Sequence, residues 1–198
     1  SDKAVNPTNA MGTTKLMGER LMTAANSNRR GNGPIFASTR FGNVLGSSGS
    51  VIPIFRAQIE QDGPVTLTDK DMTRFVMSVK EAVELVLNSV SEAKGGEVFV
   101  TKMPVMRILD LALVMIEALS SGGVEITEIG SKPGEKLYEE LMSDEETRRA
   151  IELDKFFSVL PAFRGLYSDI NYDYSEVVTE LVEDPYVSEQ KACLSRRD

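Results

Sequence analysis

The residues best suited to chemistry lie at the start of the chain, where an adjacent acid and base precede a lysine. Asp2 and Lys3 are neighbours, and Met11 and Lys15 are four positions apart in MGTTK. Positions i and i+4 share one face of a helix, so the Lys15 ammonium can reach whatever Met11 contacts. A carboxyl group and an amine can serve as general acid and base. An ordinary surface lysine gives the same spacing, because so short a pattern arises by chance.

The residue types that are missing narrow the chemistry. The chain has no histidine, which excludes Ser-His-Asp and Cys-His nucleophiles and histidine-ligated zinc. We predict no metal site, and acid–base work falls to Asp, Glu, Lys, Tyr or bound water. Cys193 is the single cysteine, so the chain forms no internal disulfide, and a reducing compartment is indicated.

Charge limits the class of ligand. The formal net charge is -8 and the pI is about 4.8, which argues against a protein that follows nucleic-acid phosphates. A small anionic ligand stays compatible, because a few arginines or a helix N-terminus can hold it locally. With 198 residues, 41% of them hydrophobic, the chain is globular and long enough for one ordinary domain or most of two small ones.

The sequence contains no recognisable signal peptide or membrane span. The longest apolar stretch, ILDLALVMIEAL, is interrupted by Asp110 and Glu117, which predicts a packed helix. We expect a cytoplasmic location. The inner face of the membrane stays open for a longer protein, because an anchor could precede residue 1.

Helices and strands are predicted to alternate. Caps and helical periodicity indicate four main helices, over residues 9–26, 51–61, 79–90 and 106–119. Short apolar runs bounded by Gly or Pro indicate four strands, over residues 34–41, 64–68, 97–101 and 124–130. Shorter helices are expected within residues 132–141 and, after a capping box at Ser143–Glu146, over residues 146–153.

Several residues are assigned to faces of these helices. The helix over 79–90 is amphipathic, with an apolar stripe of Val79, Ala82, Val83, Val86, Leu87 and Val90. The helix over 106–119 is expected to direct inward Ile108, Leu111, Ala112, Met115 and Leu119. The acidic run is interpreted as a solvated helix face and comprises Glu139, Glu140, Asp144, Glu145 and Glu146.

The alternation predicts an α/β protein, although its usual beginning is missing. No strand is predicted before the first helix. Neither G-x-G-x-x-G nor G-x-x-x-x-G-K occurs in the 198 residues. The chain alone therefore has no recognisable dinucleotide or phosphate cradle.

Several motifs together resemble one enzyme family. SDKAVNPTNAMGTTKLMGER is similar to the active-site segment of extended short-chain dehydrogenases/reductases, in particular nucleotide-sugar 4,6-dehydratases of polysaccharide biosynthesis. The resemblance continues in the family's order through TRFGNVLGSSGSVIPIF, GPVTLTDKDMTRFVMSVKEAVELVL, GGEVFV, KMPVMRILDLA and GSKPGEKLYEEL. It covers roughly residues 1–143 and implies a Rossmann-like, NAD(P)-binding α/β fold.

The resemblance implies a catalytic set. Asp2 would be the general acid at the sugar C6 hydroxyl, and Lys3 the base that removes the C5 proton. Lys15 would hold the nicotinamide ribose and favour deprotonation of the C4 hydroxyl. Met11 stands where most of the superfamily has a tyrosine base, and a thioether cannot take a proton. Ser1, a bound water or Asp2 are alternatives for accepting the C4 proton.

The resemblance also implies binding residues. The nicotinamide would lie near the backbone of Arg40, Phe41, Gly42 and Asn43. Contacts to the UDP-sugar are implied for Asn43, Ser50, Val51, Thr66, Thr68, Arg74, Lys132 and Glu135. Among these, Arg74 would neutralise the diphosphate, whereas an isolated arginine beside Asp69 and Asp71 would be a surface ion pair.

We therefore interpret the chain as the C-terminal portion of a UDP-N-acetylglucosamine 4,6-dehydratase that uses NAD or NADP. A UDP-sugar 4-epimerase and a non-catalytic UDP-sugar-binding fragment are the alternatives. The predicted divisions are residues 1–62 with the catalytic helix, 63–160 for the substrate and 161–198 as an extension. The Gly-rich cofactor-binding half would lie outside these residues, so the chain alone is expected to be inactive. Homo-oligomers and membrane anchoring are expected only of a longer protein.

Overall fold

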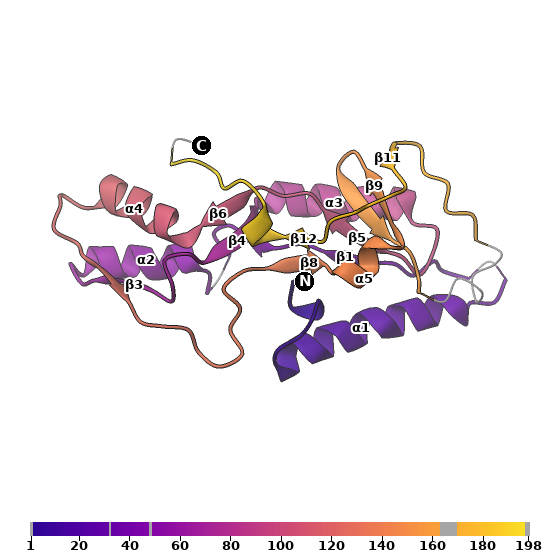
Figure 1. Cartoon of the computed structure of the whole chain (residues 1–198), viewed down its shortest axis with the longest axis horizontal. Helices are drawn as coiled ribbons and strands as arrows, with labels where there is room; N and C mark the ends of the chain where they lie inside the picture. The colour runs from indigo at the N-terminus through magenta and orange to yellow at the C-terminus, as the bar shows by residue number, and fades with distance from the viewer. Residues whose placement is uncertain (1, 32, 48, 163–169, 197–198) are drawn as a thin grey trace. The chain divides into compact units, whose positions relative to one another are not determined.

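The computed structural model describes residues 2–31, 33–47, 49–162 and 170–196 (Figure 1). These residues form two compact units, each built from stretches that are separated along the chain. Unit 1 comprises Ser1–Phe41, Lys80–Lys102 and Glu140–Val187, and unit 2 comprises Gly42–Val79, Met103–Glu139 and Ser188–Asp198. Ser1 was named as a possible proton acceptor and lies outside the described residues.

Unit 1 contains a five-stranded sheet in the order β1-β5-β10-β9-β11. Strands β1 (Ser38–Arg40) and β5 (Val98–Thr101) are parallel, so the predicted strands at 34–41 and 97–101 are confirmed in shorter form. The other strands run antiparallel and are β10 (Phe156–Val159), β9 (Ala150–Leu153) and β11 (Val177–Thr179). Phe99 and Phe156 pack edge to face in the core of this sheet.

The first helix of unit 1 begins and ends close to the prediction. Asn9 caps α1 (Ala10–Ser27) by accepting a hydrogen bond from Gly12 N at 2.9 Å. The short helix η1 (Asp2–Ala4) packs against α1. The predicted capping box at Ser143–Glu146 is confirmed at the start of α5 (Asp144–Thr147). Nearby, β8 (Glu140–Met142) pairs with β12 (Tyr186–Val187).

Unit 2 surrounds a core of its own. Its three-stranded sheet contains β2 (Asn43–Val44), β4 (Thr73–Met77) and β6 (Val105–Arg107). A parallel pair joins β3 (Val65–Leu67) to β7 (Ile126–Glu128). The helices are α2 (Val51–Glu60), α4 (Ile108–Leu119) and the short η3 (Ser188–Gln190). The buried core between α2, α4 and β3 consists of Phe55, Ile59, Val65, Leu67, Met72, Ile108, Ala112 and Met115.

Of the two helices predicted near residue 140, the first is wrong and the second is confirmed only in its first turn. Residues 132–141 form turns that lead into β8, and residues 150–153 of the second prediction form β9. The solvated acidic face is wrong for Glu139 and Glu146, which are each only 4% exposed. Both carboxylates have partners on distant segments, and periodicity along the chain cannot reveal such partners.

The structure also differs from the prediction at one face of each of two helices. Leu119 was expected to point inward but is 47% exposed at the end of α4. The apolar stripe of α3 (Val79–Glu92) is largely exposed, and the buried residues of this helix are Leu85 and Ser89. The described residues therefore leave the predicted apolar stripe largely uncovered.

A buried arginine holds part of unit 1 together. Arg40 is 1% exposed, and its Nη2 lies 2.7 Å from Glu19 Oε2 while its Nη1 lies 2.8 Å from Glu146 Oε2. Burial alone would lower the pKa of Arg40, but the two carboxylates outweigh it and raise that pKa. Burial would likewise raise the pKa of Glu146, yet the hydrogen bonds and charge of Arg40 leave it lowered.

Candidate functional site

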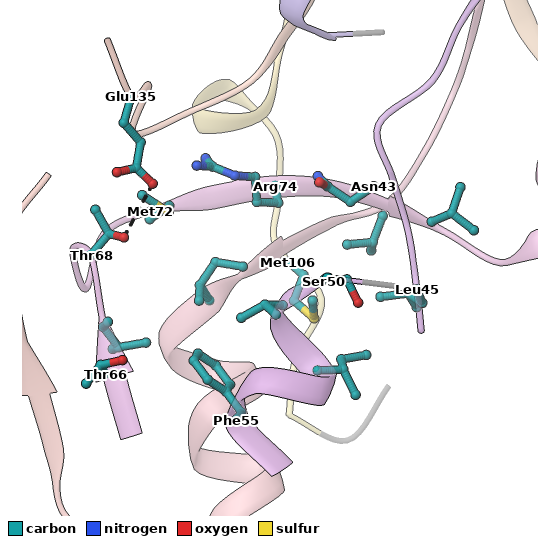
Figure 2. Close-up of a pocket in the computed structure, with 17 residues that line it drawn as sticks. Asn43, Leu45, Ser50, Phe55, Thr66, Thr68, Met72, Arg74, Met106 and Glu135 are labelled. Atoms are coloured by element: carbon teal, nitrogen blue, oxygen red, sulfur yellow. Dashed lines mark hydrogen bonds between the residues drawn. The ribbon is translucent and has the colours of Figure 1, made fainter. Parts of the chain in front are cut away.

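A pocket of about 350 Å³ in unit 2 gathers most of the predicted substrate residues. Figure 2 shows Thr66, Thr68 and Glu135 toward one side of the pocket, Asn43 and Ser50 toward the other, and Arg74 between them. Of the predicted substrate residues, Lys132 alone is not in its lining. The remaining walls are mainly apolar and include Leu45, Val51, Ile52, Phe55, Leu67, Met72, Val76, Met106 and Ile108.

Strand alternation places the polar side chains of β4 and β3 on this pocket. Successive strand residues point to opposite faces, so Arg74 and Val76 share one face of β4. Both line the pocket, whereas Phe75 is fully buried. Thr66 and Thr68 are likewise two positions apart, in β3 and at its end. The sequence thus directs one arginine and two hydroxyl groups into the same space.

Arg74 uses most of its hydrogen-bonding capacity within the protein. Its Nη1 donates to Thr73 O at 2.8 Å and Leu137 O at 3.1 Å, and its Nη2 donates to Lys136 O at 2.9 Å. Nε lies 3.5 Å from Glu139 Oε1. A guanidinium has five N–H donors, so one Nη2 hydrogen remains for a ligand. Arg74 therefore offers the pocket a positive charge and a single donor, while its fork holds residues 136–137.

The N-terminus of α2 forms another part of the lining. Gly46 and Gly49 both have φ of +73° and permit the tight turn that precedes the helix. Pro53 is accommodated in the first turn, where a missing N–H is tolerated. Ser50 stands at the N-cap and its Oγ is buried without a hydrogen-bond partner among the described residues. An unpaired hydroxyl at the positive end of a helix can bind an anion.

The opposite side of the pocket carries hydroxyl and carboxylate groups. Gln58 of α2 donates from Nε2 to Thr66 Oγ1 at 2.8 Å, and its Oε1 accepts from Thr66 N at 3.1 Å. Thr68 Oγ1 donates to Glu135 Oε1 at 3.4 Å, as the dashed line in Figure 2 marks. Glu135 Oε2 also accepts from Lys132 N at 3.2 Å. This side can accept hydrogen bonds from ligand hydroxyl groups through Glu135.

The predicted catalytic residues lie in unit 1. Asp2 is in η1, and its Oδ1 is 3.6 Å from Lys3 Nζ, with 16% of the Asp2 side chain and 47% of the Lys3 side chain exposed. Met11 and Lys15 are both exposed on α1. Lys15 forms no ion pair within the described part of the chain. The acid and base thus remain adjacent, and the Met11–Lys15 face of the helix is accessible.

Glycine at position 12 permits η1 to approach α1. A Cβ added to Gly12 would lie 2.4 Å from Lys3 O and 2.9 Å from Pro7 Cβ. Real Cβ atoms essentially never come so close, so a larger residue would push the Asp2–Lys3 segment away from the helix. Gly12, between Met11 and Lys15, therefore fixes the position of the acid–base pair relative to α1.

The residues predicted near the nicotinamide fit that role only in part. The exposed Lys15 ammonium can donate to a ribose hydroxyl. The Arg40 guanidinium is occupied by Glu19 and Glu146, so only its backbone is available. A Cβ at Gly42 would lie 2.6 Å from Phe75 O, so this position requires glycine for close packing.

Sequence reasoning did not identify three residues that shape the pocket. Gln58 orients Thr66, and Phe55 and Met106 form apolar walls. Phe55 and Gln58 lie three positions apart on α2, so helical periodicity from Ser50 was the available signal. Met106 was expected in a helix, but it lies in β6, whose pairing with β4 is not visible in the sequence.

Comparisons with known proteins identify the family. Residues 1–161 match the family of polysaccharide biosynthesis proteins. The chain belongs to this family. Its fold is that of extended short-chain dehydrogenases/reductases, and the solved structure of Pen from Bacillus thuringiensis superimposes with a TM-score of 0.86 at 39% identity. That alignment covers 99% of this chain and 56% of Pen.

Curated relatives carry more than one activity in their names. An uncharacterized membrane protein of Methanocaldococcus jannaschii is 52% identical over 81% of this chain and 50% of its own length. A UDP-glucose 4-epimerase of Rickettsia felis is 41% identical over 93% of this chain and 54% of its own length. An inverting UDP-N-acetylglucosamine 4,6-dehydratase of Campylobacter jejuni is 36% identical over 87% of this chain and 50% of its own length. The chain thus spans about half the length of these relatives.

One of these relatives is named as a membrane protein. No helix in the described part of this chain is long and apolar enough to cross a membrane.

Proposed function

We propose that the pocket of unit 2 binds a UDP-sugar. The observation that carries this proposal is the order of groups across the pocket, with hydroxyl groups and a carboxylate on one side, a cation in the middle and an amide on the other. A nucleotide sugar has the same order, because its diphosphate lies between the ribose and the sugar. Glu135 would accept from the ribose hydroxyls, and Thr66 and Thr68 would lie near the uracil.

The diphosphate would be held by positive charge more than by bidentate hydrogen bonds from the Arg74 guanidinium. Arg74 contributes a cation and one donor, and the N-terminus of α2 adds its dipole and the unpaired Ser50 hydroxyl. The backbone N–H of Val51, in the first turn of this helix, would point toward the same group. Lys132 lies outside the lining and would act only as a nearby positive charge.

For the longer protein we propose a nucleotide-sugar 4,6-dehydratase in the biosynthesis of surface polysaccharide or glycans, with UDP-N-acetylglucosamine as substrate. Lys3 would take the proton from C5 of the 4-keto sugar, and Asp2 would donate a proton to the C6 hydroxyl, which leaves as water. The side-by-side acid and base in η1 support this assignment. Gly12 supports it too, since it allows η1 to lie against α1.

NAD or NADP would be bound mainly by a Gly-rich segment outside the 198 residues, with the backbone of residues 40–43 near the nicotinamide amide. When bound, the cofactor would supply the hydride chemistry, in which a hydride leaves C4 to make the ketone and returns to C6 after the C6 hydroxyl has left as water. Lys15 would donate a hydrogen bond to the nicotinamide ribose. Its positive charge would favour deprotonation of the C4 hydroxyl. Met11 would pack against the ring, which leaves the C4 proton to Ser1, a bound water or Asp2.

A UDP-sugar 4-epimerase is the second candidate, because the Rickettsia felis relative carries that name at 41% identity. The two reactions differ at C5, where only elimination exchanges a proton. Turnover by the longer protein in deuterated water tests this. A dehydratase incorporates deuterium into its product during elimination, whereas product without solvent deuterium would contradict the dehydratase.

The binding proposal can be tested on this chain. Calorimetric titration with UDP-N-acetylglucosamine should show saturable binding, and Arg74→Gln should weaken it. A chain that binds neither UDP nor the UDP-sugar would contradict the proposal. With NAD(P) and UDP-sugar together, we expect no product from the 198 residues, which would make them a non-catalytic binding fragment. Homo-oligomerisation and membrane anchoring are proposed only for the longer protein.

A further inference from the structure

The orientation of the Asn43 side-chain amide is fixed by two groups that can only accept hydrogen bonds. Its Nδ2 donates to Phe75 O at 3.1 Å and to Glu139 Oε1 at 2.6 Å. A carbonyl and a carboxylate have no hydrogen to give, so both must face the NH2 group and not the oxygen. Both amide hydrogens are therefore in use, and Oδ1 is the polar atom of Asn43 that remains for a ligand.

Glu139 is itself held in place. It is 4% exposed, and its Oε2 accepts a hydrogen bond from Phe75 N at 2.9 Å. The Arg74 guanidinium contributes a charge at 3.5 Å, and the backbone N of Glu139 donates to Ser188 Oγ at 2.9 Å. With Oε2 committed to a backbone donor, Oε1 has a fixed position opposite Asn43. Glu139 thus acts on the pocket through Asn43.

We infer that Asn43 presents a hydrogen-bond acceptor to the bound ligand and that Glu139 is the positioning residue that fixes this orientation. The inference rests on the proposed function, and it names the part of the ligand that Asn43 recognises. Ionised diphosphate oxygens are acceptors, so Oδ1 would repel them. The matching partner is a donor, which on a UDP-sugar means a sugar hydroxyl or an acetamido N–H.

The position of Asn43 agrees with this assignment. Figure 2 shows it on the side of the pocket away from Thr66, Thr68 and Glu135, with Arg74 between. If the uridine occupies the side with Glu135 and the diphosphate lies at Arg74, the sugar reaches Asn43. A site that presents a half-buried, oriented acceptor discriminates against ligands that lack the donor.

A double-mutant cycle tests the inference. UDP and UDP-N-acetylglucosamine are titrated into the wild-type chain, Asn43→Ala, Glu139→Gln and the double variant. The measured quantity is the ratio of the two dissociation constants, which isolates the contribution of the sugar. We expect the UDP-sugar preference to fall about tenfold in each single variant, and no further in the double variant, because Glu139 acts through Asn43.

Glutamine is informative at position 139 because it replaces one acceptor oxygen with a donor. Its amide oxygen and NH2 group cannot satisfy both Phe75 N and Asn43 Nδ2, so the Asn43 amide loses its fixed orientation. Ser188→Ala is the matched control, since it disturbs the same buried segment but leaves the Glu139–Asn43 bond intact. This control should keep the wild-type preference for the UDP-sugar.

The outcomes separate the inference from the proposed function. A preference that survives Asn43→Ala would overturn the acceptor role. Equal losses of UDP and UDP-sugar affinity in Glu139→Gln would reduce Glu139 to a structural residue. If the wild-type chain binds neither ligand, the proposed function fails. In that case the side-chain amide NMR signals of Asn43 still test its orientation. Two hydrogen-bonded amide protons should exchange slowly with water, and fast exchange would contradict the orientation.

Discussion

The two units differ in how completely their helices are covered. In unit 2, α2 and α4 bury their apolar faces against one another and against β3, and the ligand pocket lies over this core. In unit 1, the apolar stripes of α1 and α3 are exposed, with Met17 at 58%, Leu21 at 60%, Leu87 at 63% and Val90 at 74%. Strand β1 also pairs on one side only within the described sheet.

We interpret this difference as a separation between the proposed ligand-binding pocket and the proposed catalytic residues. The pocket of unit 2 has its walls, its cation and its oriented amide within the described residues. The acid–base pair of unit 1 lies beside a helix whose apolar face has no cover there. The aligned part of this chain covers only about half of these relatives, so a further segment of a longer protein would have a surface to pack on. Ligand binding is accordingly expected of the chain itself, and turnover only of the longer protein.

The largest expected effect is on the buried charges of unit 1. Arg40→Met would remove the cation beside Glu19 and leave Glu146 with Arg149 alone, 3.6 Å away, and should lower the free energy of unfolding by about 3–5 kcal/mol. Lys80→Met is the control, because Lys80 is 85% exposed in a surface pair and should change stability by less than about 1 kcal/mol. Urea unfolding measures both. Similar losses in the two variants would show that unit 1 does not depend on its buried ion pairs.

The same arginine should govern the response to acid. Because Arg40 keeps the pKa of Glu146 below its usual range in the folded state, this carboxylate contributes stability above its unfolded pKa. That contribution is lost as pH falls through the lowered folded pKa. Arg40→Met removes the strongest causes that lower the pKa of Glu146 and keeps the smaller ones from Ser143 and Arg149, so less of this acid-sensitive stability remains to be lost. Unfolding midpoints from pH 7 to 3 should fall less steeply in the variant, and parallel curves would contradict this assignment.

Phe55 tests whether the core of unit 2 supports the pocket. Phe55→Ala removes a ring that is 2% exposed and also lines the pocket, so we expect a loss of about 3–5 kcal/mol in unfolding free energy. UDP affinity should fall with it. Urea unfolding and UDP titration at low temperature measure the two effects. Unchanged UDP binding in a destabilised variant would show that the pocket does not depend on this core.

Gly12 tests the approach of η1 to α1. Gly12→Ala would create the contact with Lys3 O and should destabilise by about 1–3 kcal/mol, as overpacking does. Gly18 is the matched control in the same helix, since an added Cβ there meets nothing within 4 Å. Gly18→Ala should stabilise by about 0.5–1 kcal/mol. Thermal unfolding distinguishes them, and two stabilised variants would contradict the close approach.

The smallest effect is expected on the exposed stripe of α3. Leu87→Ser should change the free energy of unfolding of this chain by no more than about 0.5 kcal/mol, because Leu87 is 63% exposed. Urea unfolding measures this change. A large loss of stability would mean that the stripe is covered and would remove the contrast between the units.

Local signals predicted much of the fold. Cap chemistry predicted the helices that begin after Asn9 and at the Ser143–Glu146 box. Periodicity predicted α2 and α4. No strand was predicted at β4, because Asp69, Lys70, Asp71 and Arg74 surround its short apolar run. It forms because β2 and β6 pair with it, and neither pairing can be predicted from neighbouring residues in the sequence.

Several residues assigned to one ligand from the sequence line one pocket, but their hydrogen bonds were not predicted. The resemblance placed Asn43, Arg74 and Glu135 on one ligand, and they share one pocket. Glu139 was read as solvated because its neighbours are acidic. Its partner Asn43 is 96 positions away, and the partner of Glu146 is Arg40, 106 positions away. Burial of a charge depends on such distant partners, which spacing along the chain does not reveal.

The most direct test of the account is a ¹H–¹⁵N NMR titration of this chain with UDP-N-acetylglucosamine. We expect saturable chemical-shift changes in unit 2, at Asn43, Ser50, Thr66, Thr68 and Arg74, while the signals of α1 stay unchanged. Arg74→Gln should weaken the same pattern without moving it. Saturable shifts centred on α1, or none at all, would contradict the claim that the pocket of unit 2 recognises the nucleotide sugar.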